Sequence, residues 1–188
     1  MKIELAKQLY DSEWARRDQL AGAVTVPISV VTGLAGGIAL LVSSYSFDTS
    51  LVTTVFWFLV VIAISFLLLA GFWLVRSYHG YEYEQIPSPA ELEKYDRDLI
   101  VYYEAMGEAE TGRPEFESYL GEKYIEAAEQ NAHNNGSRAA FLYQATRSII
   151  LALIATGLVL MPWAINAAGR EPSPQHIVID QTQGGHAR

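Results

Sequence analysis

Three long stretches without charge constrain this chain more than any other feature. Residues 22–43, 51–75 and 148–168 together hold 68 of the 188 residues and no Asp, Glu, Lys, Arg or His. Each stretch reaches the length of about 20 residues that a helix needs to cross a bilayer core of ~30 Å. Helices satisfy their backbone hydrogen bonds internally, as the bilayer core demands. The sequence therefore predicts an all-α membrane protein with three transmembrane helices.

The distribution of basic residues predicts the orientation. Eleven of the 13 lysines and arginines precede the first stretch or lie between the second and the third, and the loop 44–50 has none. Because basic residues are enriched on the cytoplasmic side, the N-terminus is expected in the cytoplasm. The expected parts are a cytoplasmic N-terminal helix 1–21, two transmembrane helices in 22–76, a cytoplasmic helical region 77–147, a third transmembrane helix 148–168 and a tail 169–188. The alternative is a re-entrant third helix, which returns the tail to the cytoplasm.

Residues that typically start or end helices divide the region 77–147 into several helices. Ser88-Pro89-Ala90-Glu91 predicts a capping box, and Gly112-Arg113-Pro114 predicts the end of that helix and the start of another. Asn134-Asn135-Gly136-Ser137 predicts a further break, after which Arg138 begins the helix that enters the third span. In the tail, Ile177-Val178-Ile179 fits one short strand or nothing regular.

The formal charge of −8 belongs entirely to the region 77–147, which holds 14 acidic and six basic residues. A negative vestibule beside a membrane opening would concentrate cations, whereas the simpler interpretation is a solvated acidic surface. The negative balance argues against coating of nucleic acid and against anchoring through a polybasic patch, but it leaves room for a small local basic pocket.

No catalytic signature is present. The chain has no cysteine, its four histidines lack metal-ligand spacing, and no carboxylate lies within a span. Proton-coupled transporters and intramembrane hydrolases usually need ionisable groups at membrane depth. We therefore expect neither an enzyme nor a protein with a metal or cofactor.

The first span carries a polar stripe. Thr25, Ser29, Thr32 and Gly36 are four, three and four residues apart, so they share one helix face. Such a stripe either lines a water-filled path formed by several copies or lets helices approach closely.

Aromatic and cationic residues of the region 77–147 form a second candidate site. Arg113, Lys123, Arg138 and Arg147, with aromatic faces such as Tyr102, would hold a nucleotide by phosphate contact and stacking. Core packing and interfacial anchoring explain most of the tyrosines more simply.

The N-terminal half also resembles a known family. The segment 9–20 (LYDSEWARRDQL), followed by a Thr/Pro/Gly-containing span and a bulkier second span, resembles the SLATT superfamily of bacterial membrane effectors over residues 5–76. The resemblance implies an oligomeric, pore-forming effector of nucleotidyltransferase-linked antiphage defence in the inner membrane. Related systems include three-span channel effectors paired with enzymes that make short DNA oligomers.

These expectations combine into one hypothesis and one alternative. The hypothesis is a homo-oligomeric ion channel, most simply a tetramer, that responds to a nucleotidyltransferase-type partner enzyme or its cyclic or linear oligonucleotide, disrupts the membrane and arrests growth. The alternative is a non-conducting membrane scaffold that recruits a soluble partner through Leu92, Tyr102 and Phe116.

Overall fold

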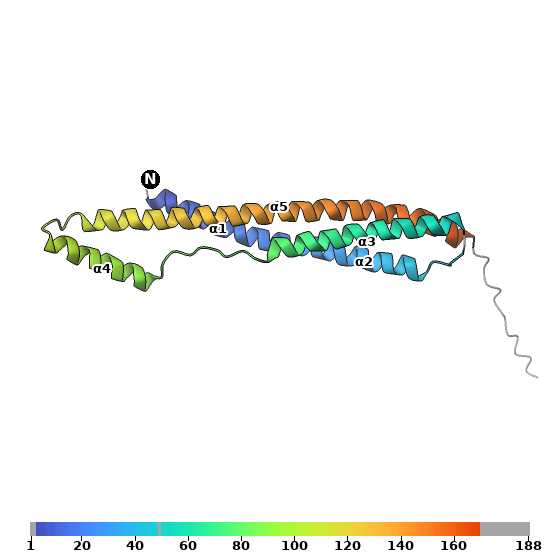
Figure 1. Ribbon diagram of the computed structural model, residues 1–188, viewed down its shortest axis with the longest axis horizontal. Helices are drawn as coiled ribbons and strands as arrows, with labels where there is room; N and C mark the ends of the chain where they lie inside the picture. Colours follow the sequence, from blue (N-terminus) through green and yellow to red (C-terminus); the bar gives the residue numbers. More distant parts are fainter. Residues whose placement is uncertain (1–2, 49, 170–188) are drawn as a thin grey trace, which may run out of the picture.

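The computed structural model describes residues 3–48 and 50–169, in which every regular element is an α-helix (Figure 1). The helices are α1 (Ile3–Ala23), α2 (Thr25–Ser43), α3 (Leu51–Tyr78), α4 (Pro89–Ala105) and α5 (Gly112–Ala168). Three helical runs, Ile3–Ser43, Leu51–Tyr78 and Gly112–Ala168, are long and apolar enough to cross a membrane. The all-helical class and the three candidate spans thus agree with the sequence prediction.

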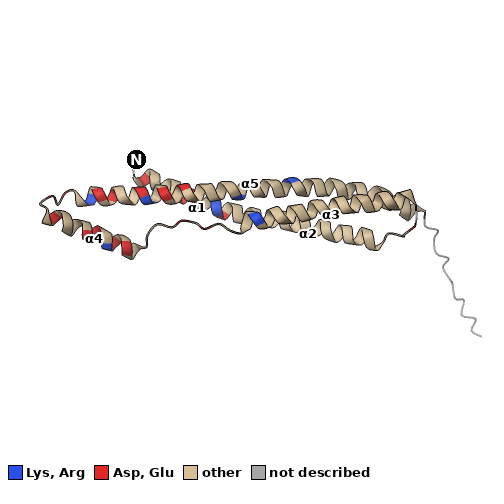
Figure 2. Cartoon of the chain, viewed as in Figure 1, with Lys and Arg blue, Asp and Glu red and all other residues tan. Residues whose placement is uncertain are grey.

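The molecule is a long rod with two different halves. The 57-residue α5 runs along most of it, with α3 and α2 beside its C-terminal part and α1 and α4 beside its N-terminal part (Figure 1). We call α2, α3 and residues 148–168 the apolar half, and α1 and residues 79–147 the charged half. Among the described residues, every acidic side chain except Asp48 belongs to the charged half (Figure 2).

The core of the apolar half alternates small and large side chains. Phe56, Val60 and Ala63 of α3 pack in one cluster with Ala152 and Val159 of α5, all with almost no exposed surface. Alanines at such positions let helix backbones approach closely, which is the usual basis of helix association in membranes. This packing accounts for why α3 and α5 lie side by side over the full length of the apolar half.

Hydrogen bonds join α5 to the α2–α3 loop at the end of the apolar half that is farther from the charged half. The backbone amide of Ser46 donates to Asn166 Oδ1 at 3.1 Å, and Asn166 Nδ2 donates back to the Ser46 carbonyl at 2.9 Å. Trp163 Nε1 donates to Ser44 Oγ at 2.9 Å. The end of α5 therefore lies beside the loop that joins α2 to α3.

Most of the predicted helix ends are confirmed. Ser88 Oγ accepts from the Glu91 amide, the Glu91 carboxylate accepts from the Ser88 amide, and α4 begins at Pro89. These hydrogen bonds hold the pKa of Glu91 below its usual value. Helix α5 begins at Gly112 as predicted, and a turn at Val24 separates α1 from α2. Val24 keeps a helical backbone conformation and its carbonyl accepts from the Ile28 amide at 3.2 Å, whereas Pro27 has no amide hydrogen to donate to the preceding turn.

The predicted break at residues 134–137 is wrong, because α5 continues through them without interruption. Asn134 and Asn135 are buried and direct their side-chain amides to other segments of the chain. An asparagine whose amide is bonded elsewhere no longer competes for its own backbone, so tertiary contacts override its low helix propensity. Arg138 accordingly lies in the middle of a helix, and the strand considered at 177–179 lies outside the described residues.

Candidate functional site

The polar stripe of α2 lies on the face that no other helix of the chain covers. Thr25, Ser29, Thr32 and Gly36 are all exposed. The covered residues of α2 follow another line, Val31, Leu34, Ile38 and Leu41, which pack against the core of the apolar half. At about 100° per residue, the centres of the two faces are roughly 170° apart around the helix. Most of the stripe therefore points away from α3 and α5, and only Thr25, at its start, lines a groove together with Gly71 and Leu74 of α3.

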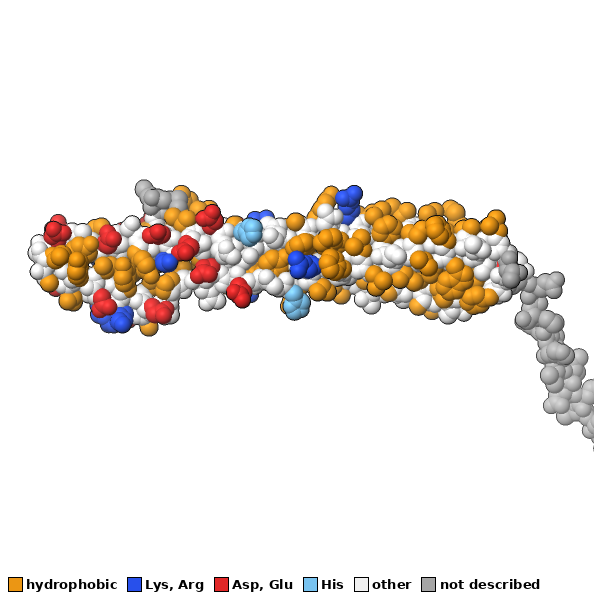
Figure 3. All heavy atoms as spheres, viewed as in Figure 1, with side chains coloured by type: hydrophobic (Ala, Val, Ile, Leu, Met, Phe, Trp, Pro, Cys, Tyr) orange, Lys and Arg blue, Asp and Glu red, His pale blue; other side chains and the backbone are white. Residues whose placement is uncertain are grey.

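The outward faces of α3 and α5 have a different composition. Large apolar side chains dominate both in the apolar half, as the orange surface of Figure 3 illustrates for one side of the molecule. They include Phe58, Val61, Leu68 and Phe72 of α3 and Ile150, Leu153, Ile154, Leu160 and Met161 of α5. Bulky apolar residues suit contact with lipid, whereas small and hydroxyl residues suit contact with another helix or with water.

Two of the three stripe hydroxyls, those of Ser29 and Thr32, donate within their own helix. Ser29 Oγ donates to the Thr25 carbonyl at 3.1 Å, and Thr32 Oγ1 donates to the Ile28 carbonyl at 3.0 Å. Each oxygen retains lone pairs, and a hydroxyl that donates to its helix can still accept from water. No side chain in the stripe carries charge, so the stripe provides a weakly polar lining.

The structure does not bring the predicted ligand residues together. Arg113, Lys123, Arg138 and Arg147 are 10, 15 and 9 residues apart along α5, which corresponds to about 15, 22 and 13 Å at 1.5 Å per residue. Arg113 and Lys123 pair with Glu117 and Glu126 on their own helix. Tyr102 is exposed on α4. Within one chain these residues thus form separate positions and no single pocket.

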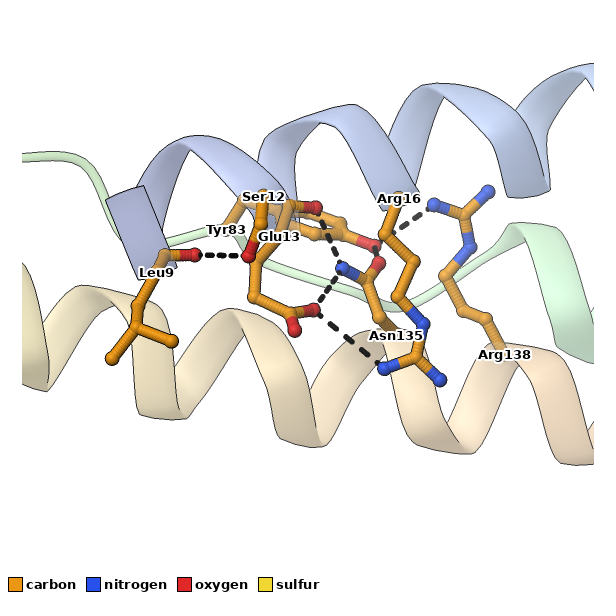
Figure 4. Close-up of polar contacts among 7 residues, drawn as sticks. All are labelled: Leu9, Ser12, Glu13, Arg16, Tyr83, Asn135 and Arg138. Atoms are coloured by element: carbon orange, nitrogen blue, oxygen red, sulfur yellow. Dashed lines mark hydrogen bonds and ion pairs between the residues drawn. The ribbon is translucent and has the colours of Figure 1, made fainter. Parts of the chain in front are cut away.

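Arg138 occupies a buried junction between the two halves (Figure 4). Its Nε donates to the Ser77 carbonyl at 3.0 Å, and one terminal nitrogen donates to Tyr83 Oη at 2.8 Å. Tyr83 Oη in turn donates to Asn135 Oδ1 at 2.6 Å. The guanidinium therefore connects the end of α3, the extended segment 79–88 and α5.

Three asparagines extend this junction along α5. Asn131 exchanges two hydrogen bonds with the backbone of Glu84, at 2.9 and 3.1 Å, and Asn134 Nδ2 donates to the Glu82 carbonyl at 2.6 Å. Asn131, Asn134, Asn135 and Arg138 have the spacing of residues on a single helix face. That face binds the segment 77–84 mainly through its backbone. The sequence interpretation missed this function, although the spacing of 131, 134, 135 and 138 was a readable signal for it.

The junction also holds α1. Asn135 Nδ2 donates to the Glu13 carbonyl at 2.8 Å and to Glu13 Oε2 at 2.9 Å (Figure 4). The guanidinium of Arg17 lies over the rings of Trp14 and Tyr83, at 4.7 and 5.0 Å from their centroids. Trp14 Nε1 is buried without a hydrogen-bond partner, so the Trp14 ring is held by packing and by the cation. Three chain segments thus meet at Asn135.

No grouping of three or more His, Asp or Glu side chains suited to a metal ion occurs in the part of the chain that the structure describes. Comparisons with family models, with curated proteins and with solved structures give no match for this chain.

Proposed function

We propose that this protein is the subunit of a homo-oligomeric ion channel in the inner membrane of a bacterium, with α2 around the axis. The N-terminus and the charged half lie in the cytoplasm in this arrangement, since most of the basic residues belong to that side. The contact between the end of α5 and the loop 44–50 fits spans that cross the membrane alternately.

One observation carries the proposal: the outward face of α2 carries a continuous stripe of small and hydroxyl residues, which Val26, Ile28 and Leu40 flank. A single chain leaves this face without a partner, while it directs large apolar side chains of α3 and α5 outward. Several copies arranged with α2 inside and α3 and α5 outside would give each face the surroundings that suit it. We propose a ring of four copies.

The junction supplies a route from the charged half to α2. Helix α1 leads into α2 through the turn at Val24, and Asn135 of α5 holds α1 at Glu13. A signal that moves α5 or the segment 79–88 therefore acts on the helix that precedes α2. The resemblance to SLATT effectors favours a nucleotidyltransferase-type partner enzyme, or its cyclic or linear oligonucleotide, as the source of that signal. Membrane disruption and growth arrest during phage infection would be the outcome.

Two serines provide a matched test. Ser29 of α2 and Ser65 of α3 are both exposed, and each donates its hydroxyl to the carbonyl four residues earlier, at 3.1 and 2.8 Å. We expect Ser29→Leu to reduce ion flux severalfold in liposomes that contain the protein and its activating partner, and Thr32→Leu to do the same. Ser65→Leu should leave the flux unchanged, because its side chain faces lipid. Equal effects of the two serine variants, or no flux from folded oligomeric protein with any partner, would refute the proposal.

A second function is favoured by a different surface. Val101, Tyr102 and Met106 at the end of α4 are 66%, 55% and 61% exposed, although Leu92 and Phe116 are half-buried between α4 and α5. These three side chains would suit a membrane scaffold that recruits a soluble partner. The scaffold predicts that Tyr102→Ala abolishes partner capture and that Ser29→Leu has no effect on toxicity.

A further inference from the structure

The net negative charge of the region 77–147 is confined to the part of that region that is farther from the apolar half. Residues 82–129 contain 14 acidic and four basic residues, a balance of −10. From residue 130 to the end of α5 the only charged side chains are Arg138 and Arg147, and the C-terminal turn of α3 adds Arg76. The region 77–147 that sums to −8 therefore divides into an acidic arm and a basic zone at the edge of the apolar half (Figure 2).

The basic residues of these two zones differ in their partners. Three of the four basic residues of the arm, Arg97, Arg113 and Lys123, lie within 4.0 Å of a glutamate carboxylate on the same helix, and the fourth, Lys94, has no ion pair among the described residues. Arg76 and Arg147 are exposed, and the structure shows no ion pair for either among the described residues. The guanidinium of Arg76 lies 5.4 Å from the centroid of the Phe141 ring. Two exposed cations therefore remain without a carboxylate at the edge of the apolar half.

Aromatic residues accompany both cations. Tyr78 lies two residues after Arg76, and Tyr143 lies one helical turn before Arg147; both rings are largely exposed. Tyrosines at this level are typical of the membrane interface, where the ring contacts apolar chains and the hydroxyl reaches the headgroups. Arg16 and Arg17 of α1 add positive charge a short distance before the first span, partly offset by Glu13 and Asp18.

An apolar groove lies beside this zone. Its lining comes from the α1–α2 turn and the end of α3, with Val24, Ile28 and Leu74 along it and Tyr78 and His79 at its polar end. The groove has a volume of about 540 Å³. It leads from the level of the arginines toward the apolar half, as a groove for an acyl chain should.

We propose that Arg76 and Arg147, with Tyr78 and Tyr143, form a basic collar that binds the headgroups of anionic phospholipids. Each arginine adds an attraction to the negative leaflet, and the acidic arm is repelled by the same leaflet. The two effects together hold the arm away from the membrane and fix the depth of the spans. The inference requires that the apolar half is embedded in a bilayer, and it is independent of ion conduction.

The test uses the full-length protein in a non-ionic detergent, with short-chain phosphatidylglycerol as the probe and thermal unfolding as the readout. Phosphatidylglycerol should raise the Tm at low micelle fractions, and phosphatidylcholine should not. At about 1 kcal/mol for each basic residue near an anionic surface, Arg76→Gln with Arg147→Gln should raise the half-saturating concentration roughly 30-fold. The double lysine variant should retain the wild-type value, and 0.5 M NaCl should weaken binding in both.

The control is Arg97→Gln with Arg113→Gln, which removes two exposed arginines that are paired in the arm. It should leave the lipid response unchanged. The proposal is overturned if both double variants behave alike, if phosphatidylcholine works as well, or if inorganic phosphate or a short DNA oligonucleotide reproduces the shift. If the glutamine variant fails to fold, the lysine variant still tests whether positive charge at these two positions is sufficient. The headgroup and salt comparisons on the wild type then test whether binding depends on the charge of the lipid.

Discussion

The two halves of the rod are held together by different kinds of contact. In the apolar half, α3 and α5 meet through Ala63, Ala152 and Ala155, and the hydroxyls of Ser65 and Thr156 bond only to their own helices. In the charged half, buried side chains of α5 donate to the backbone of other segments, as Asn135 does to Glu13. The apolar half is therefore held together mainly by apolar packing, and the charged half mainly by directional hydrogen bonds.

This difference suggests how each half responds to force. Between the junction and the polar contacts of Ser44 and Ser46 at the other end, packed small side chains define close approach but allow helices to slide or rotate slightly, since no hydrogen bond joins α3 to α5 in that stretch of the described chain. Buried hydrogen bonds are either made or broken, and an unmade bond is costly. We infer that the junction moves as one rigid unit, and that adjustment occurs among the spans.

The largest expected effect comes from removing the most connected junction side chain. Asn135→Leu keeps a similar volume but removes the acceptor of the Tyr83 hydroxyl and the amide that donates to Glu13, while Tyr83 Oη still accepts from Arg138. At about 1–3 kcal/mol for each buried group left unsatisfied, we expect a loss of about 3 kcal/mol in the free energy of unfolding of the charged half. Limited proteolysis of the segment 79–88 in the detergent-solubilised protein would measure it.

Gln130→Leu is the control for this variant, since Gln130 is exposed on the same helix. It should change the cleavage rate little. Similar protection of both variants would show that the junction does not hold the charged half together, and the contrast between the halves would fail.

A smaller effect is expected from overpacking the apolar half. Ala152→Leu places three extra carbons where no surface is exposed, between α5 and α3. Such insertions cost about 1–3 kcal/mol, and here sliding of the helices should relieve part of the strain. Thermal unfolding of the detergent-solubilised protein gives the change. The same substitution at the exposed Ala164 should be neutral, and equal losses at both positions would indicate that α3 and α5 do not pack this way.

Local signals in the sequence were sufficient for much of the fold. Charge-free length predicted the three spans, and Ser88 with Glu91 and Gly112 with Pro114 marked helix ends that the structure confirms. Each signal acts through the backbone within one or two turns, so neighbouring residues decide its outcome. The stripe residues were predicted to share a face for the same reason. Which way that face points depends on the packing of α2 against α3 and α5, which the spacing alone does not give.

Long-range contacts explain what the sequence interpretation missed. Asn134 and Asn135 looked like a helix break because their partners at Glu82 and Glu13 lie about 50 and 120 residues away in the chain. The cations of α5 were grouped as one candidate site from composition alone, which does not give their separation in space. Once α5 is continuous, the distance between them follows from helix rise. That this protein binds a nucleotide ligand stays a prediction.

Removing the capping box should have a more modest and more local effect. Ser88→Ala takes away the acceptor of the Glu91 amide and should destabilise the start of α4 by about 1 kcal/mol. Hydrogen exchange of the first α4 amides would detect this, while the amides of α3 should be unaffected. Ser118→Ala, on the exposed surface of α5, should be neutral because alanine favours a helix interior. Faster exchange throughout the rod would mean that the two halves unfold as one unit.

The smallest expected effect is a response to acid at one helix start in each half. Hydrogen bonds from Ser50 and Thr53 lower the pKa of Asp48 before α3, and hydrogen bonds from Ser88 lower the pKa of Glu91 in α4. Because both pKa values are lowered in the folded state, each ionised carboxylate stabilises its helix start above its ordinary pKa. This stabilisation should be constant between pH 7 and 5 and should be lost as the pH falls through the lowered values. Asp48→Asn should abolish the acid response of the first α3 amides, and Glu91→Gln that of the first α4 amides, in hydrogen exchange from pH 6 to 3. If either variant removes both responses, the two helix starts are coupled through the length of the rod, and the halves are less independent than their contacts indicate.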